Sequence, residues 1–178
     1  MLAAAGGPAA RLILVLAAVH AARRDAIRRL QLDDLDLGNR RITIAGSTRP
    51  LDDLTRTLLQ DWLSCRQARW PGTANPHVLL NRKAAMETGP VSPSWISEAL
   101  PGKTATVERL RIDRHFEEAL ACGPDPPHLA AVFGFSPKTA IRYTNAARQL
   151  LQTQAEICAS PSAGPCPGSR TMINGHER

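Results

Sequence analysis

The sequence predicts a mainly α-helical domain with one small β-hairpin or sheet near its N-terminal side. Apolar residues recur at helical spacing over most of residues 9–152, and one short stretch alternates polar and apolar residues as a half-buried strand does. Pairs of glycine and proline separate these segments. A chain of 178 residues is long enough for one domain that buries a core without disulfides or metals.

The first helix is expected over residues 9–22, after a flexible start at residues 1–8. Pro8 suits a first helical turn, where no backbone N–H is needed. The run Leu12–Val19 is apolar on nearly every face, so this helix should cross the core. The run is too short for a membrane span. Residues 1–10 carry no positive side chain, which argues against a secretory signal peptide. We therefore expect a cytoplasmic protein without a membrane partner.

A short helix and a β-hairpin are expected next. Asp25 is a candidate cap for the helix. Residues 41–45 alternate polar and apolar side chains and predict a half-buried strand. The turn is expected at residues 46–48, and a short return strand at residues 49–51 would carry Pro50 on a sheet edge.

An amphipathic helix is predicted over Leu51–Trp70, with Asp52 or Asp53 as its N-cap. Its expected apolar stripe is Leu54, Leu58, Leu59, Trp62 and Leu63. His20, on the apolar first helix, is expected to be a core histidine whose polar atoms are satisfied. The rest of the predicted elements are a brief strand at 77–80, a short helix at 94–100, three helices at 106–121, 127–133 and 136–152, and a disordered tail at 153–178.

The charge of the chain favours a nucleic-acid partner. The net charge is +6 and almost all of the excess is arginine, because lysine occurs only at three positions, Lys83, Lys103 and Lys138. The planar guanidinium can donate two hydrogen bonds to one phosphate. An arginine-rich composition also arises from a GC-rich genome, so a helical interaction domain with no nucleic-acid role stays an alternative.

The cysteines do not predict a metal site. They are Cys65, Cys122, Cys158 and Cys166. They form no CxxC pair, and no histidine lies at ligand spacing from them; His115 and His128 have no ligand partner at useful spacing. We expect Cys65 and Cys122 to be small core residues and the two tail cysteines to be free. No metal and no cofactor is expected.

Residues 107–151 carry the features that suggest chemistry. Arg111 and Arg114 lie on one predicted helix, and the only tyrosine of the chain, Tyr143, follows some thirty residues later. A tyrosine after an arginine-bearing helix is compatible with phosphoryl chemistry on DNA. The same residues are also compatible with a packed helical bundle whose tyrosine is half-buried.

The ordered series of motifs resembles the catalytic domain of tyrosine recombinases, the phage-integrase family. VHAARRDAIRRLQLDDLDL is similar to the segment with the family's first arginine, and ITIAGSTRPL to the strand pair that follows. RLRIDRHFEEALACG is similar to the helix with the second arginine, and FGFSPKTAIRYTNAARQLL to the segment with the nucleophile. The resemblance covers about residues 9–151 and implies the fold of that catalytic domain.

The resemblance implies DNA recombination or integration. In the family a tyrosine hydroxyl attacks a DNA phosphodiester, giving a 3′-phosphotyrosyl link and a free 5′-hydroxyl, while two arginines hold the charged oxygens. Residue by residue, Tyr143 matches the nucleophile, and Arg23 and Arg111 match the two arginines. The residues expected to contact DNA are Arg24, Arg49, Arg114, Lys138 and Arg142. The implied partner is double-stranded DNA, with a homo-oligomer on that DNA left open.

The sequence departs from the family where protons are handled. The histidine expected three residues before the second arginine is Glu108, and the later histidine or tryptophan is Phe135. No lysine matches that of the family's hairpin, where only Arg49 is nearby, and the acidic residue after the first arginine is replaced by Ala26. The family's N-terminal DNA-binding domain has no counterpart in these residues. The pattern favours a truncated or degenerate copy that binds DNA with impaired catalysis.

A helix-turn-helix module is the first alternative. That motif has a small residue, a turn glycine and an apolar anchor at fixed spacings. In this chain the small residue is Ala130, the turn glycine is Gly134, and the anchor positions are Ala140 and Ile141. The second helix, Ser136–Tyr143, would then lie in the major groove. In this interpretation Lys138, Thr139 and Arg142 would face the DNA, and no covalent chemistry is implied.

Overall fold

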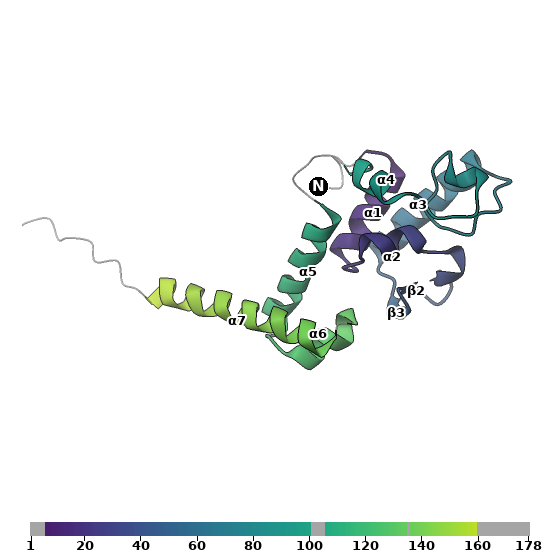
Figure 1. Cartoon of the computed structure of the whole chain (residues 1–178). Coiled ribbons are helices and arrows are strands. Elements are labelled where there is room, and N and C mark those ends of the chain that lie inside the picture. The colour runs from purple at the N-terminus through teal and green to yellow at the C-terminus, as the bar shows by residue number, and fades with distance from the viewer. Residues whose placement is uncertain (1–5, 101–105, 135, 160–178) are drawn as a thin grey trace, which may run out of the picture.

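The computed structural model describes residues 6–100, 106–134 and 136–159, with side chains up to residue 153 (Figure 1). Its helices are α1 (Pro8–Ala18), α2 (Arg24–Arg29), α3 (Asp53–Arg69), α4 (Pro93–Glu98), α5 (Val107–Ala121), α6 (Pro126–Phe133) and α7 (Pro137–Ala159), with 3₁₀ turns η2 (Leu32–Asp34) and η3 (Ala84–Met86). Its strands are β1 (Leu35–Asp36), β2 (Arg41–Ile44) and β3 (Ser47–Pro50). The predicted mainly helical fold with a small sheet is confirmed.

Some predictions concern residues outside this description. They are the first five residues of the expected flexible start, Phe135, the side chain of Cys158, and Cys166 with the rest of the expected tail beyond residue 159. Helix α7 ends at Ala159 rather than at Gln152, so the predicted helix was too short.

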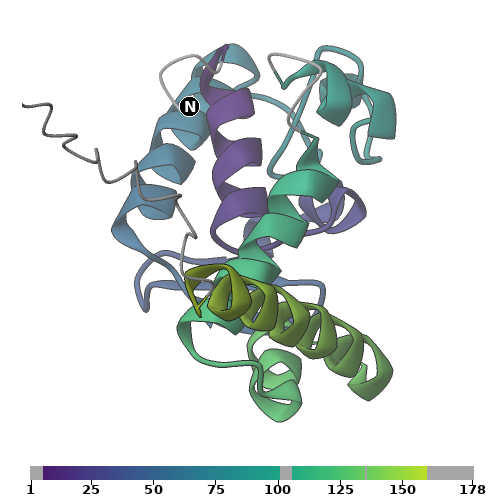
Figure 2. The ribbon, with the colours of Figure 1, turned by 90° about the vertical axis from the view of Figure 1, so that its left-hand side faces the viewer.

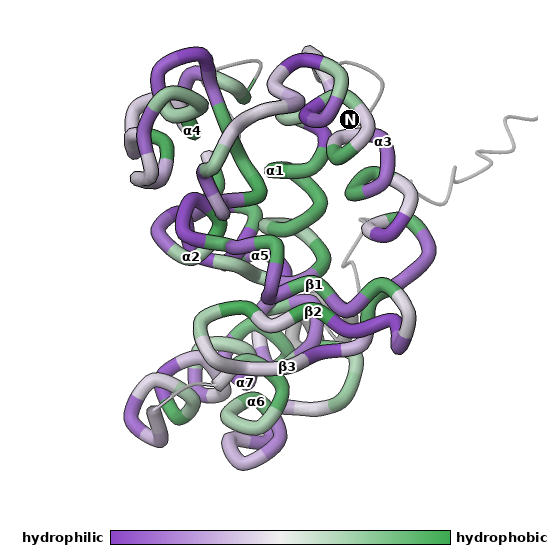
Figure 3. The backbone as a smooth tube through the Cα atoms, turned by 90° about the vertical axis from the view of Figure 1, so that its right-hand side faces the viewer, coloured by the Kyte–Doolittle hydropathy of each residue, from purple (hydrophilic) through white to green (hydrophobic). Residues whose placement is uncertain are grey.

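Helix α1 is the centre of the main core. It packs against α3 and α5. Leu12, Ile13 and Leu16 are fully buried, and Figure 3 shows most of the helix coloured as hydrophobic. The helix ends at Ala18 rather than at residue 22, because Ala21 takes a positive φ of 50°. This left-handed residue lets the Ala22 N–H bond the Leu16 carbonyl at 3.0 Å, which closes the helix end.

The end of α1 continues into a short helix whose cap differs from the prediction. Arg23, in an extended conformation, is the N-cap of α2. Asp25 is not the cap; it lies in the first turn and accepts a hydrogen bond from Arg28 Nε at 3.0 Å. A carboxylate in the first turn is still favourable there because it faces the positive end of the helix dipole.

The sheet is antiparallel with the strand order β1-β2-β3. Ile42 and Ile44 are buried, which confirms the predicted alternation on β2. The turn was predicted one residue too late: Ala45 (φ 51°) and Gly46 (φ 80°) form it, and β3 begins at Ser47. Two consecutive residues with positive φ suit a two-residue hairpin connection, because its twist matches that of the strands.

Helix α3 confirms the predicted amphipathic helix and its cap. The Asp52 carboxylate accepts a hydrogen bond from the Thr55 N–H at 2.8 Å. Leu54 is 46% exposed, however, so the predicted stripe was wrong at its first position. Thr55 is fully buried instead, since its hydroxyl bonds both Asp52 and the ring of His20 at 3.1 Å. His20 is therefore a satisfied buried histidine, as expected.

The segment between α3 and α5 is held mainly by buried side chains. Residues 77–80 were predicted as a strand, but His77 forms only an isolated bridge with Gln31. Val78, Leu79 and Leu80 are nevertheless fully buried. Apolar runs of this kind pack in the core without a partner strand to pair with. Helix α4 follows, capped by the Ser92 hydroxyl.

Helices α5, α6 and α7 enclose a second, smaller hydrophobic core (Figures 1 and 2). Its buried members are Ala21, Ala119, Leu129, Phe133, Ala140, Tyr143 and Ala147. Thr106 caps α5 and Asp125 caps α6. Gly134 ends α6 with a φ of 65°, and a side chain there would meet Ser47 Oγ at 3.3 Å. The end of α6 thus lies against the β2–β3 hairpin.

The two described cysteines are not core residues of the kind expected. Cys65 is half-buried at the edge of the main core, and Cys122 is exposed at the end of α5. Among the described helices, none is long and apolar enough to cross a membrane.

Candidate nucleic-acid interface

A cavity of about 210 Å³ lies between the start of α2, the β2–β3 hairpin, α5 and the end of α6. We call it the arginine cavity. Its lining residues with charged or polar side chains are Arg23, Ser47, Arg49, Arg111 and His115. A water molecule occupies about 30 Å³ in the liquid, so this volume can hold a phosphate group together with water. Three guanidinium groups around a cavity of this size make it a favourable binding site for an anion.

Arg23 and Arg49 reach the cavity from two neighbouring segments. Arg23 is exposed and follows the left-handed residue Ala21, which turns the chain after α1. Arg49 and Ser47 are the alternate residues of β3 that face inward. Arg49 donates to the His20 carbonyl and, at 3.5 Å, to the Phe133 carbonyl. These two bonds tie the hairpin to the ends of α1 and α6 and fix the position of the guanidinium.

Arg111 is held by Glu108, three residues earlier on α5. The Arg111 side chain is 10% exposed, and its Nε and Nη2 atoms both donate to the Glu108 carboxylate, the Nε bond being 3.1 Å. The hydrogen bond from Arg111 is the largest cause of the lowered pKa of Glu108, which is therefore ionised at neutral pH. A phosphate that uses Arg111 must share it with this carboxylate or displace it.

His115 also lines the cavity, one helical turn after Arg111. It is 1% exposed, and burial, followed by the nearby charge of Arg111, lowers its pKa to about 4. The imidazole is therefore neutral at pH 7. The sequence interpretation gave His115 no role, although the spacing of four residues from Arg111 places the two side chains on one helix face.

Tyr143 lies next to the arginine cavity but is not among its lining residues. It is 8% exposed and belongs to the second core. Its ring makes edge contacts with His115, at 5.0 Å between centroids, and with Phe116, at 5.7 Å. The structure therefore brings Arg23 and Arg111 to one cavity and places the Tyr143 ring against a residue of its wall.

The other residues expected to contact DNA lie outside the cavity lining, except Arg49. Arg24 is exposed on α2, with Nη1 at 3.5 Å from Ser97 Oγ. Arg114 is half-buried and pairs with Glu118 at 2.7 Å. Lys138 and Arg142 are exposed one turn apart on α7. Arg24 and Arg114 are therefore already in contact with protein atoms, while Lys138 and Arg142 on α7 are open to solvent.

The helix-turn-helix spacing is matched only in part. Helix α6, the left-handed Gly134 and helix α7 follow in the expected order, and α6 packs against α7. Ala140 is fully buried, but Ile141, the expected apolar anchor, is 49% exposed. Tyr143 takes the buried position instead, since it lies three residues after Ala140 on the same face of α7.

A larger cavity of about 710 Å³ lies elsewhere, beside α1 and α3. Its wall includes Trp62, Trp70 and Trp95, together with Arg69 and Arg82. None of the site residues predicted from the sequence lines it. Three tryptophans accompany its two arginines, whereas three arginines line the smaller arginine cavity, which makes the latter the better candidate for a phosphate.

No protein-family model and no curated protein matches the sequence. Solved structures do match. The XerA recombinase superposes with a TM-score of 0.66 at 19% identity over 86% of this chain and 61% of its own. The XerH recombinase bound to palindromic difH substrate gives 0.62 at 18% identity, over 84% of this chain and 45% of its own.

A third similar structure is the Tn1549 transposon integrase in complex with a circular intermediate DNA. It gives a TM-score of 0.53 at 15% identity, over 79% of this chain and 57% of its own. The chain thus spans about half of the length of the structures that it matches. At these identities the likeness concerns the fold, and the described residues have the fold of a tyrosine-recombinase catalytic domain.

Proposed function

We propose that the chain binds double-stranded DNA by holding a backbone phosphate at the arginine cavity, in the setting of DNA recombination or integration. The observation that carries this proposal is that Arg23, Arg49 and Arg111, from three separate elements, line one small cavity. Like charges are brought together only at a cost, and a bound phosphate would offset that cost. The recombinase-like fold supports the same partner, since two of the similar structures are complexes with DNA.

Strand transfer is proposed to be impaired, because the proton-handling groups are poorly suited to it. A general acid works best with a pKa near the working pH, and His115, with a pKa of about 4, is neutral at pH 7. Ala26 lines the cavity where the family has an acidic residue. On the hairpin, Arg49 stays charged and is a poor proton donor.

The positions of Arg111 and Tyr143 also favour impaired strand transfer. Glu108 already engages two of the five N–H donors of Arg111 and offsets its positive charge. Tyr143 is buried in the second core rather than exposed in the cavity. A nucleophile has to lie within about 3–3.5 Å of the reacting atom, so Tyr143 would have to move before it could attack. We therefore propose binding without efficient cleavage.

A helix-turn-helix mode of binding is the second candidate, and one observation favours it. Lys138 and Arg142 are exposed one turn apart on α7, where they could contact DNA directly. The two candidates share a partner but use different surfaces. A cavity variant would weaken binding in the first mode, and a variant of Lys138 or Arg142 would do so in the second.

Replacement of Arg23 tests the proposed surface. Arg23→Gln is expected to lower the affinity for a duplex DNA about tenfold, because it removes one charge-assisted hydrogen bond to phosphate. It should also reduce the slope of log affinity against log salt by about one. Fluorescence anisotropy with labelled duplex DNA over a series of salt concentrations measures both quantities.

Arg29→Gln is the matched control. Arg29 is exposed at the other end of α2, carries the same charge and does not line the cavity. Equal losses in the two variants would mean that only net charge matters and would contradict the proposed site. Affinity that does not change with salt in the wild-type protein would favour an interaction domain with no nucleic-acid role.

A further inference from the structure

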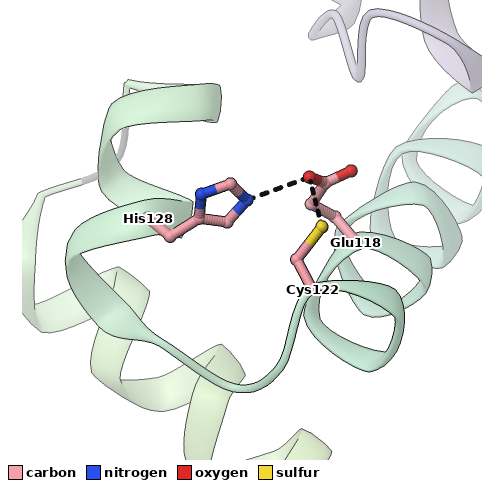
Figure 4. A group of neighbouring side chains, drawn as sticks. All are labelled: Glu118, Cys122 and His128. Carbon is pink, nitrogen blue, oxygen red and sulfur yellow. Dashed lines mark hydrogen bonds and ion pairs between the residues drawn. The ribbon is translucent and has the colours of Figure 1, made fainter.

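Three side chains with metal-ligating atoms meet where α5 ends and α6 begins (Figure 4). Glu118 and Cys122 lie one turn apart at the end of α5, and His128 lies in the first turns of α6. The Glu118 Oε1 atom is 3.0 Å from His128 Nε2 and 3.4 Å from Cys122 Sγ. The three ligand atoms all lie within 4.8 Å of one another. This group is separate from the arginine cavity, whose lining contains none of the three.

Two of the three separations among these atoms are close to those around a tetrahedral ion, and the third pair, Cys122 Sγ and the His128 ring, lies within 4.8 Å. Zinc binds sulfur at about 2.3 Å and nitrogen or oxygen at about 2.0–2.2 Å. At a tetrahedral angle these bond lengths separate neighbouring ligand atoms by roughly 3.4–3.6 Å. The two separations from Glu118 Oε1, 3.0 and 3.4 Å, are within a few tenths of an ångström of that geometry. Thiolate, imidazole and carboxylate are also the ligand types that zinc takes.

The carboxylate is oriented by a neighbour that is not a ligand. Arg114 donates to Glu118 Oε2 at 2.7 Å, which leaves Oε1 directed at His128 and Cys122. The backbone of His128 is fixed in turn, since its N–H donates to the capping Asp125 carboxylate at 3.3 Å. Outer groups that hold ligands in place in this way are common in metal sites. They hold the Glu118 carboxylate and the start of α6 in place, so that only a small approach of Cys122 and His128 is needed when an ion binds.

The site is accessible as well as ordered. The side chain of Glu118 is 15% exposed and that of His128 is 37% exposed, while Cys122 is an exposed residue. An ion can therefore enter from solvent, and a water molecule can occupy the fourth tetrahedral position. The sequence spacing did not indicate this group, because it is the turn between α5 and α6 that brings His128 back to Cys122.

We propose that Glu118, Cys122 and His128 bind one Zn²⁺ ion, with water as the fourth ligand. The thiol of Cys122 gives up its proton to solvent when the sulfur–zinc bond forms, and the ion joins the end of α5 to the start of α6. This connection stabilises the second core, to which Leu129 and Phe133 of α6 belong. The proposal concerns metal binding alone and does not depend on DNA binding.

Titration of the purified full chain, first freed of metal with a chelator, tests the site. We expect one equivalent of Zn²⁺ to bind in competition with a chromophoric chelator. Cys122→Ser and His128→Gln should each lower the affinity at least about tenfold, since each removes a ligand. Cys65→Ser and the double variant Cys158→Ser/Cys166→Ser are the matched controls and should bind as the wild type does.

Co²⁺ in place of Zn²⁺ identifies the ligands independently of affinity. The wild-type chain should show thiolate-to-cobalt charge-transfer absorbance and the intense visible bands of a tetrahedral site, and Cys122→Ser should lose the charge-transfer absorbance. The proposal is overturned if the wild type binds no stoichiometric ion or shows no thiolate band. It is also overturned if binding persists in Cys122→Ser and His128→Gln, or disappears with the tail cysteines.

Discussion

Replacing Glu108 with glutamine is expected to raise the affinity for duplex DNA about tenfold. The carboxylate occupies two donors of Arg111 and lowers the positive potential of the arginine cavity. Removing its charge leaves Arg111 free to bind a phosphate, and a charge-assisted bond is worth about 1.5–3 kcal/mol. Anisotropy titration of a labelled duplex with the wild type and Glu108→Gln at one salt concentration measures the change.

Asp113→Asn separates this effect from net charge. Asp113 lies on the same helix, is exposed and pairs with an arginine, Arg109, at 3.2 Å. Arg109 does not line the arginine cavity, whereas Arg111, the partner of Glu108, does. We expect Asp113→Asn to change affinity by less than Glu108→Gln does. A decrease in affinity in Glu108→Gln would mean that the carboxylate positions Arg111 for DNA rather than competing with it.

Replacing Leu129 with alanine is expected to lower the free energy of unfolding by about 2–5 kcal/mol. Leu129 is fully buried in the second core, which has few other large buried side chains. A small core has little other apolar area to compensate for the cavity that the substitution leaves. Urea denaturation followed by far-ultraviolet circular dichroism measures the change.

Val132→Ala is the control on the same helix. Val132 is 36% exposed, so its truncation should cost much less. If Leu129→Ala is as mild as Val132→Ala, α6 does not contribute to the cooperative fold in the way its burial indicates. Leu129→Ala should also weaken DNA binding, because Phe133 at the end of α6 forms part of the cavity wall.

The fold was largely predictable because its main elements have strong local signals. The alternation of Ile42 and Ile44 identified β2, and Asp52 identified the start of α3. The errors occurred where a backbone conformation decides the outcome. Ala21 and Ala45 both take positive φ. Alanine seldom adopts this conformation, so the sequence gives no sign of it at these positions. The end of α1 and the hairpin turn were therefore misplaced by a few residues.

The candidate site was predictable only in part. The positions of Arg23 and Arg111 came from the order of motifs, and both line one cavity. The bond between Arg111 and Glu108 could have been expected, since residues three apart on a helix are neighbours. The burial of His115, which makes its imidazole neutral, depends on how α5 packs against other helices. The packing of α5 against other helices cannot be inferred from the spacing of residues within α5.

The group of Glu118, Cys122 and His128 illustrates the same limit. Two of its members are one turn apart on α5, a spacing that a helix brings together in any context. The third joins them only because the turn after Cys122 reverses the chain. Contacts within a helix can be inferred from a sequence, whereas contacts across a turn require its geometry.

A nicked duplex that traps any covalent intermediate tests the central claim most directly. The chain is mixed with this substrate, and each sample is run on a native gel and on a denaturing gel, with Tyr143→Phe beside the wild type. Binding with impaired catalysis predicts a retarded complex on the native gel that dissociates fully under denaturing conditions. A denaturation-resistant adduct that Tyr143→Phe abolishes would contradict impaired catalysis, and the absence of any complex would contradict DNA binding.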